Sequence, residues 1–222
     1  YFKKYGFDFF KDLGLPENKL RFKDHEKLAH YAKEACDIEY LFPFGWGEIN
    51  GTHNRTDFDL SRHQEYSGKM EYFDQQENLK YIPYIIESTY GLDRTVLAII
   101  CNSLCNVKDE NGNERTILRI NNDLAPMKVS ILPLEKKKHS EQALKVYKEL
   151  RKSLMTYYDD KGNIGKRYKS SDAIGTPYSI CIDDNTLNNN TVTIRDRDTK
   201  EQMTVSLDNV ENVLQKKLKR KI

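Results

Sequence analysis

The segment LAPMKVSILPL, residues 124–134, most constrains how this chain can fold, because Pro126 and Pro133 enclose a short apolar run within a polar sequence. A short apolar run bounded by turn residues is typical of a fully buried strand, which we expect at residues 127–134. Helical and strand-like segments alternate beyond it, which predicts a small α/β domain with parallel strand pairing. The expected strands are residues 155–158, 178–182, 191–195 and 202–207; the expected helices are one capped by Ser140, one ending at Ile174 and a basic one closing the chain.

The sequence before this segment predicts a different organisation. Residues 1–35 are expected to be helical with breaks, because Leu28, Tyr31, Ala32 and Ala35 recur at helical spacing after Asp24. Further along, the patterns predict two strands joined by a turn in residues 36–51, a short polar helix at 57–65, a strand at 81–89, an apolar helix after Gly91 and a hairpin turn at Asn111-Gly112. We therefore expect two domains, residues 1–122 and 123–222.

Composition excludes several classes of protein. The 36 Lys and Arg residues nearly balance the 34 Asp and Glu residues, so any nucleic-acid contact must come from a local basic patch rather than bulk charge. No apolar run is long enough to span a membrane. Four cysteines without a CxxC pair argue against a disulfide scaffold or a zinc site of paired cysteines, and favour a reducing, cytoplasmic location.

Charged residues gather near the ends of the expected strands in the first half. Glu48, Arg55, Asp59, Glu87 and Arg94 are of the types that bind amines, metals and phosphates. Surface ion pairs and turn caps are the alternative interpretation of each residue taken alone. Spacing does not complete a known nucleotide motif, because Gly45-Trp46-Gly47 is not followed by the third glycine of GxGxxG.

Taken together, several segments resemble the glycyl-tRNA synthetases of the dimeric class II type. The resemblance is carried by DIEYLFPFGWGEINGTHNRTDFDLSRH (37–63), YIPYIIESTYGLDRTVLAII (81–100), LAPMKVSILPL (124–134), DDKGNIGKRYKSSDAIGTPYSICID (159–183) and TVTIRDRDTKEQ (191–202). GLDR resembles the third signature motif of class II synthetases. The resemblance implies an antiparallel-sheet catalytic domain, present in part, followed by a mixed-sheet α/β anticodon-binding domain.

The resemblance also implies a role for particular residues. These enzymes join glycine to ATP and then transfer the glycyl group to tRNA(Gly). The implied ATP-binding residues are Glu48, Ile49, Gly91, Leu92, Asp93 and Arg94, with Glu48 holding Mg²⁺ through ATP and Arg94 near the γ-phosphate. The implied glycine-binding residues are Glu87, Ser88, Thr89, Tyr90 and Gly91. Where the family often has Glu-Pro-Ser, this chain has Glu87-Ser88-Thr89, which keeps a hydroxyl but adds a methyl group.

The anticodon-binding domain is expected to offer a local cationic patch to tRNA. Its expected members are Lys166, Arg167, Tyr168, Arg195 and Arg197, with the tyrosine ring able to stack on a base. Two alternatives stay open: the Arg195-Asp196-Arg197-Asp198 run can pair with itself, and the terminal KKLKRK run can be a solvated tail.

The family's first and second motifs are not found in this chain, so we expect it to be inactive alone; the intact enzyme is expected to be a homodimer. The competing hypothesis is a non-catalytic, nucleic-acid-binding module on the same scaffold, like the synthetase-like accessory subunit of mitochondrial DNA polymerase. Such a module need not keep Glu48, Glu87, Asp93 and Arg94. All four are present, which favours the enzyme.

Overall fold

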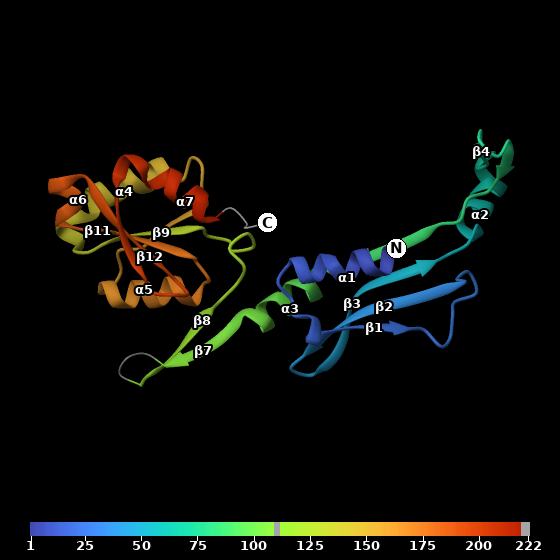
Figure 1. Ribbon diagram of the computed structural model, residues 1–222, viewed down its shortest axis with the longest axis horizontal. Coiled ribbons are helices and arrows are strands. Elements are labelled where there is room, and N and C mark those ends of the chain that lie inside the picture. The colour runs from blue at the N-terminus through green and yellow to red at the C-terminus, as the bar shows by residue number, and fades with distance from the viewer. Residues whose placement is uncertain (109–111, 219–222) are drawn as a thin grey trace. The chain divides into compact units, whose positions relative to one another are not determined.

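The computed structural model describes residues 1–108 and 112–218, and these residues form two compact units, Tyr1–Asn102 and Ser103–Ile222 (Figure 1). The second unit contains a hairpin that precedes the apolar segment at residue 124. The domain boundary expected between residues 122 and 123 stays a prediction. Among the described residues, no helix combines the length and apolar character that a membrane span requires.

The first unit is an antiparallel sheet with helix α1 (Phe2–Asp12) along one face (Figure 1). Its strands, in the order β1-β2-β3-β6, are Leu20–Asp24, Glu34–Phe42, Gly45–Asn54 and Ile86–Tyr90. The remaining elements are η1 (Glu17–Lys19), α2 (Phe58–Ser67), the small hairpin of β4 (Tyr72–Asp74) and β5 (Leu79–Tyr81), and α3 (Leu92–Ser103). Phe10, Ile38, Tyr40 and Ile49 are among the residues that fill the core under α1.

Close packing of α1 on the sheet depends on a glycine. A Cβ added at Gly6 would lie 3.0 Å from Ile38 Cδ1 and 3.2 Å from Asn50 Oδ1. The same face carries Phe22, whose ring is 4.9 Å from that of Phe7, and Tyr90, whose ring is 5.1 Å from that of Phe9. Helix α1 therefore covers this face and leaves the other face of the sheet to polar side chains.

The second unit is a five-stranded mixed sheet with helices on both faces (Figure 1). Strand β10 (Thr156–Tyr158) runs parallel to β9 (Val129–Pro133), which runs parallel to β11 (Tyr178–Ile182). Strands β12 (Thr191–Asp196) and β13 (Gln202–Ser206) continue the sheet in antiparallel pairing. Helices α4 (Lys136–Leu150), α5 (Ile164–Ala173), α6 (Asp184–Asn189) and α7 (Val210–Leu218), the turn η2 (Leu207–Asn209), and the hairpin of β7 (Leu104–Lys108) and β8 (Glu114–Leu118) complete the unit.

The two faces of this sheet differ in chemistry because successive side chains of a strand point to opposite sides. Val129, Ile131, Ile180 and Ile182 pack with α4 and α7 in an apolar core. The alternate residues Ser130 and Ser179 face α5, where Ser130 donates a hydrogen bond to Ser179 and Ser171 donates one to Ser130. One face of the sheet thus carries the apolar core and the other carries a polar layer.

Most of the expected elements are present, and three predictions are wrong. The segment after Asp24 is not helical, because β1 ends at Asp24 and the backbone NH of His25 bonds Ala35 O where β2 begins. Residues 81–89 are not one strand, since β5 ends at Tyr81 and β6 begins at Ile86. Ser140 does not cap α4, which begins at Lys136. The expected hairpin pairs β7 with β8, but Asn111 in its turn is outside the described residues, as is part of the terminal basic run.

Candidate functional site

The face of the first unit's sheet opposite α1 carries polar residues from all four strands. Pairing of His53 with Glu87 and of Gly51 with Asp37 and Thr89 puts these side chains on one face. The surroundings of Gly51 agree, because a Cβ there would lie 3.3 Å from His53 Nε2, 3.5 Å from Asp37 Oδ1 and 3.5 Å from Thr89 Oγ1. Charged and hydroxyl groups from distant parts of the sequence therefore meet around a glycine.

A β-bulge brings Glu48 to the same face. The pairing of β2 with β3 shifts register between Ile38 and Glu39, so that Glu39 lies opposite Glu48 and Ile49 is the extra residue. The Ile49 side chain is buried in the core, whereas the Glu48 side chain is about half exposed. Without the bulge, simple alternation would turn Glu48 toward α1.

Glu48 contacts Arg94, which lies in the first turn of α3. Arg94 Nη1 donates to the Glu48 carbonyl oxygen at 3.0 Å and lies 3.4 Å from Glu48 Oε2. The backbone NH of Gly91 donates to Ile49 O at 2.9 Å and fixes the start of α3 against β3. Leu92 and Asp93 are exposed at this helix start. The structure thus brings the six residues expected at the ATP site together at the junction of β3 and α3.

The five residues expected to bind glycine divide between the two faces of β6 and the turn after it. Glu87 and Thr89 lie on the polar face, where Thr89 Oγ1 is 3.4 Å from Gly51 O. Ser88 and Tyr90 point to the α1 face, where Ser88 Oγ is 3.3 Å from Asn50 Nδ2 and the Tyr90 ring contacts Phe9 and Phe10. Gly91 follows the strand. Only Glu87 and Thr89 therefore offer side chains to the polar face.

Glu87 belongs to an ion-pair network that the family resemblance did not assign. Arg55 Nη1 donates to Glu87 Oε2 at 2.7 Å, and the same guanidinium binds both oxygens of Asp59 at 2.6 and 2.9 Å. The hydrogen bond from Arg55 holds the pKa of Asp59 below its ordinary value. The Arg55 guanidinium also lies 4.2 Å from the centre of the Tyr31 ring. Arg55 thus fixes the Glu87 carboxylate and leaves its second oxygen available.

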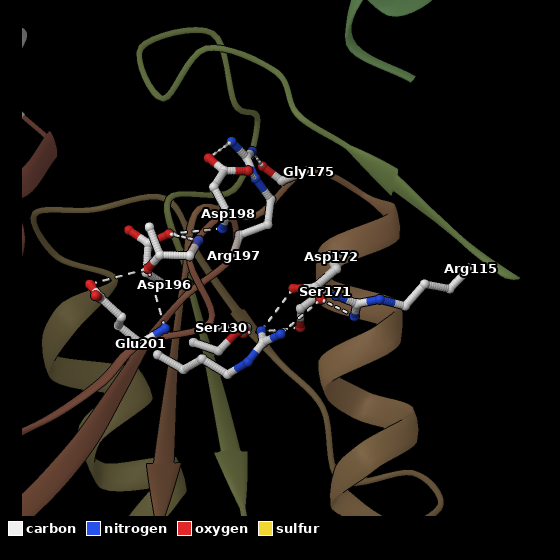
Figure 2. Close-up of polar contacts among 12 residues, drawn as sticks. Arg115, Ser130, Ser171, Asp172, Gly175, Asp196, Arg197, Asp198 and Glu201 are labelled. Carbon is white, nitrogen blue, oxygen red and sulfur yellow. Dashed lines mark hydrogen bonds and ion pairs between the residues drawn. The ribbon is translucent and has the colours of Figure 1, made fainter. Parts of the chain in front are cut away.

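The three arginines expected to contact tRNA, Arg167, Arg195 and Arg197, are all buried. Figure 2 shows the polar contacts around Asp172 and Arg197. Arg195 donates to both oxygens of Asp172, at 2.9 and 3.1 Å, and Arg115 of β8 donates to the same carboxylate at 2.8 Å. Arg197 Nη1 donates to Gly175 O at 2.8 Å, and its other nitrogens bind Asp198. These contacts give Arg195 and Arg197 a structural role.

Arg167 and Tyr168 lie on α5. The Arg167 guanidinium is buried and donates to the backbone carbonyl oxygens of Pro133, Asp160, Lys161 and Gly162, so it secures the loop before α5. Tyr168 is partly buried with its ring 4.9 Å from the Arg195 guanidinium, and burial raises the pKa of its hydroxyl. Of the five expected tRNA contacts, Lys166 alone has an exposed side chain.

These features define a chain whose second unit is a five-stranded mixed sheet with helices on both faces, and part of this unit matches a known family. Residues 128–217 match the family described as "Anticodon binding domain". The match covers the whole mixed sheet together with α4, α5, α6 and most of α7.

Over nearly its whole length the chain is similar to glycine–tRNA ligases, so the resemblance seen in the sequence is confirmed. It is 49% identical over 221 residues to the ligase of Clostridium kluyveri, covering 98% of this chain and 48% of the relative. It is 45% identical to the ligase of Clostridium acetobutylicum and 44% identical to that of Caldanaerobacter subterraneus subsp. tengcongensis, in each case over 222 residues and 48% of the relative. The chain thus spans about half the length of the curated relatives it matches.

Proposed function

We propose that this chain forms part of a glycine–tRNA ligase of class II: the region of the catalytic domain that contains motif 3, and the anticodon-binding domain. The observation that carries the proposal is similarity to glycine–tRNA ligases over 98% of the chain, which includes both units. The reaction has two steps. Glycine and ATP give glycyl-adenylate and pyrophosphate, and the glycyl group then passes to the 3′ end of tRNA(Gly) with release of AMP.

In the first step, Glu87 and Thr89 would hold glycine on the polar face. The Glu87 oxygen not bound to Arg55 can accept from the ammonium group, which is a charge-assisted contact. The hydroxyl of Thr89 adds a polar contact beside Gly51. The side chains of Ser88 and Tyr90 face α1, so these residues would offer only backbone groups to glycine. Their side chains would position β6 against α1.

ATP would bind where β3 meets α3. The Glu48 carboxylate is about half exposed and touches Arg94 through one oxygen only, so its second oxygen can bind Mg²⁺, which prefers oxygen ligands. When bound, Mg²⁺ supplies charge neutralisation for the phosphates. The exposed Arg94 guanidinium is suited to the γ-phosphate. Gly91 leaves the backbone accessible beside the nucleotide.

In the second unit, we propose that Lys166 contacts the tRNA backbone while Arg167, Tyr168, Arg195 and Arg197 shape the surface around it. An exposed lysine at the N-terminus of α5 can bind a phosphate, whereas the buried arginines are already saturated by protein acceptors. We also propose a cytoplasmic location and, for the intact enzyme, a homodimer.

The test is binding of chain 1–222 to a tRNA(Gly) anticodon stem-loop, measured by fluorescence anisotropy at fixed salt. The comparison is a stem-loop with the anticodon bases changed. We expect about tenfold preference for the glycine anticodon, which corresponds to about 1.4 kcal/mol. Equal and steeply salt-dependent binding to both RNAs would instead favour the non-catalytic accessory module.

A pair of lysine variants sharpens this experiment. Lys166→Ala should weaken binding to both stem-loops and reduce the salt slope by about one, because it removes one phosphate contact. Lys137→Ala is the matched control, since Lys137 is an exposed lysine on α4, which packs on the other face of the sheet. Equal loss in the two variants would contradict the assignment of Lys166.

A further inference from the structure

His25, Asp37 and His53 form a cluster on the polar face of the first unit's sheet. Their ligand atoms all lie within 4.8 Å of one another, although His25 directly follows β1 and the other two residues lie in β2 and near the end of β3. His25 Nε2 is 2.7 Å from Asp37 Oδ2, and the two imidazole rings are 5.7 Å apart with an edge-to-face angle of 67°. Two imidazoles and one carboxylate thus bring their ligand atoms close together.

The charge around Asp37 is incompletely balanced. The residue is 8% exposed, and within the part of the chain that the structure describes its carboxylate hydrogen-bonds only to His25. The nearest basic side chains of β1 bind elsewhere: Arg21 lies 2.6 Å and Lys23 3.1 Å from the oxygens of Glu39. His25 is charged only when it is protonated, so beside a neutral His25 this buried carboxylate has no positive counter-charge, and a bound cation would supply one.

The space beside the cluster is kept open by a glycine. A Cβ at Gly51 would lie 3.3 Å from His53 Nε2 and 3.5 Å from Asp37 Oδ1, so any larger residue would enter the region between these two ligand atoms. His53 makes no hydrogen bond through its ring among the described residues. A small rotation toward Asp37 therefore costs no hydrogen bond and keeps the ring beside that of His25.

We propose that His25, Asp37 and His53 bind a divalent transition metal of the zinc type. Zinc accepts imidazole nitrogen and carboxylate oxygen at about 2.0–2.2 Å, so a small rotation of His53 would close the set. Magnesium prefers oxygen ligands and would be excluded. Three protein ligands leave a coordination position open toward the polar face, where Glu87 and Thr89 also lie. This site is separate from the Mg²⁺ site proposed at Glu48 and does not depend on the proposed function.

The test is equilibrium dialysis of tag-free chain 1–222 against Zn²⁺, with Co²⁺ absorption as a second readout. We expect one equivalent of Zn²⁺, no displacement by excess Mg²⁺, and a cobalt spectrum without the charge-transfer band of a thiolate ligand. His53→Ala should raise the Kd at least tenfold, and Gly51→Ala should also weaken binding although it removes no ligand. His63→Ala is the matched control, because His63 is exposed on α2 outside the cluster, and it should bind as the unaltered chain does.

Two results would overturn the proposal. One is the absence of a one-equivalent site in the unaltered chain, and the other is equal affinity in the unaltered chain and His53→Ala. Circular dichroism of each variant separates loss of the ligand from loss of the fold. Because Gly51→Ala keeps all three ligands, its effect reports on the geometry of the site rather than on the number of histidines.

Discussion

Asp172 is the residue on which the polar layer of the second unit depends. Its side chain is 1% exposed and binds the guanidinium groups of Arg195 and Arg115, which come from β12 and β8 (Figure 2). Arg115 binds Asp172 through Nη1, whereas its Nε and Nη2 are buried without a hydrogen-bond partner among the described residues. Removing the carboxylate charge would leave two buried cations without a counter-charge.

We predict that Asp172→Asn lowers the free energy of unfolding by about 3–5 kcal/mol, because breaking a buried ion pair leaves its partners uncompensated. Urea denaturation followed by circular dichroism measures the change. Asp208→Asn is the control, since Asp208 is exposed and, among the described residues, its side chain is bound only by Asn190; its effect should stay within about 0.5 kcal/mol. A loss below about 1 kcal/mol in Asp172→Asn would show that the charges are screened.

At the scale of elements, the end of α5 is held by a tightly packed glycine. Gly175 has φ +83°, and a Cβ there would lie 2.8 Å from Ile120 Cγ2 and 3.1 Å from Leu118 Cδ2. We predict that Gly175→Ala costs about 2–4 kcal/mol, since the strain of a left-handed conformation adds to overpacking. Gly162→Ala, with φ +68° but only the flexible Lys166 side chain nearby, should cost about 1–2 kcal/mol. Thermal unfolding of both variants separates the cost of overpacking from the cost of backbone strain. Equal losses of stability in the two variants would contradict a contribution from packing at Gly175.

The elements predicted correctly are those whose signals are local. The apolar run before Pro133 gives β9, and the aromatic and glycine-rich run after Cys36 gives the β2–β3 pair. The failures depend on distant partners. The residues at helical spacing after Asp24 do not share one buried face, because Leu28 is 44% exposed whereas Ala35 is buried in β2. The start of α4 is stabilised instead by His139, whose Nδ1 accepts from the Glu135 backbone NH and whose Nε2 lies 3.0 Å from Asp184, 45 residues away.

The same distinction applies to the candidate site. The motif positions of Glu48, Glu87 and Arg94 could be identified from the sequence, but the face that each side chain occupies could not. That depends on the register of three strands and on the bulge at Ile49. Likewise, Arg195 belongs to a basic run in the sequence, yet its partner Asp172 lies 23 residues away. Charge spacing cannot distinguish an exposed cation from a buried, neutralised one.

For the molecule as a whole, the ion pairs of its arginines determine whether residues 1–222 alone can stabilise the phosphates of ATP. On the polar face, Arg21 is paired with Glu39, Arg55 with Asp59 and Glu87, and Arg94 with Glu48. Adenylate formation places negative charge on the phosphates, and its stabilisation needs cations that are not already neutralised. Arg94, whose side chain is 60% exposed against 45% for Arg21, is the most exposed of the three and can turn to a phosphate, but one guanidinium does not hold both the α- and γ-phosphates.

We therefore predict that chain 1–222 shows no glycine-dependent exchange between pyrophosphate and ATP. The assay uses radiolabelled pyrophosphate with Mg²⁺, and the glycine–tRNA ligase of Clostridium kluyveri, of which this chain spans 48%, is the positive control. The stem-loop experiment on the same preparation shows whether its second unit is folded, and a cooperative thermal transition of residues 1–102 expressed alone shows whether the first unit folds, so inactivity cannot be attributed to a damaged sample. Exchange above the glycine-free background would overturn the prediction if the Arg94→Ala variant abolished it. Such a result would mean that residues 1–222 suffice for the first step.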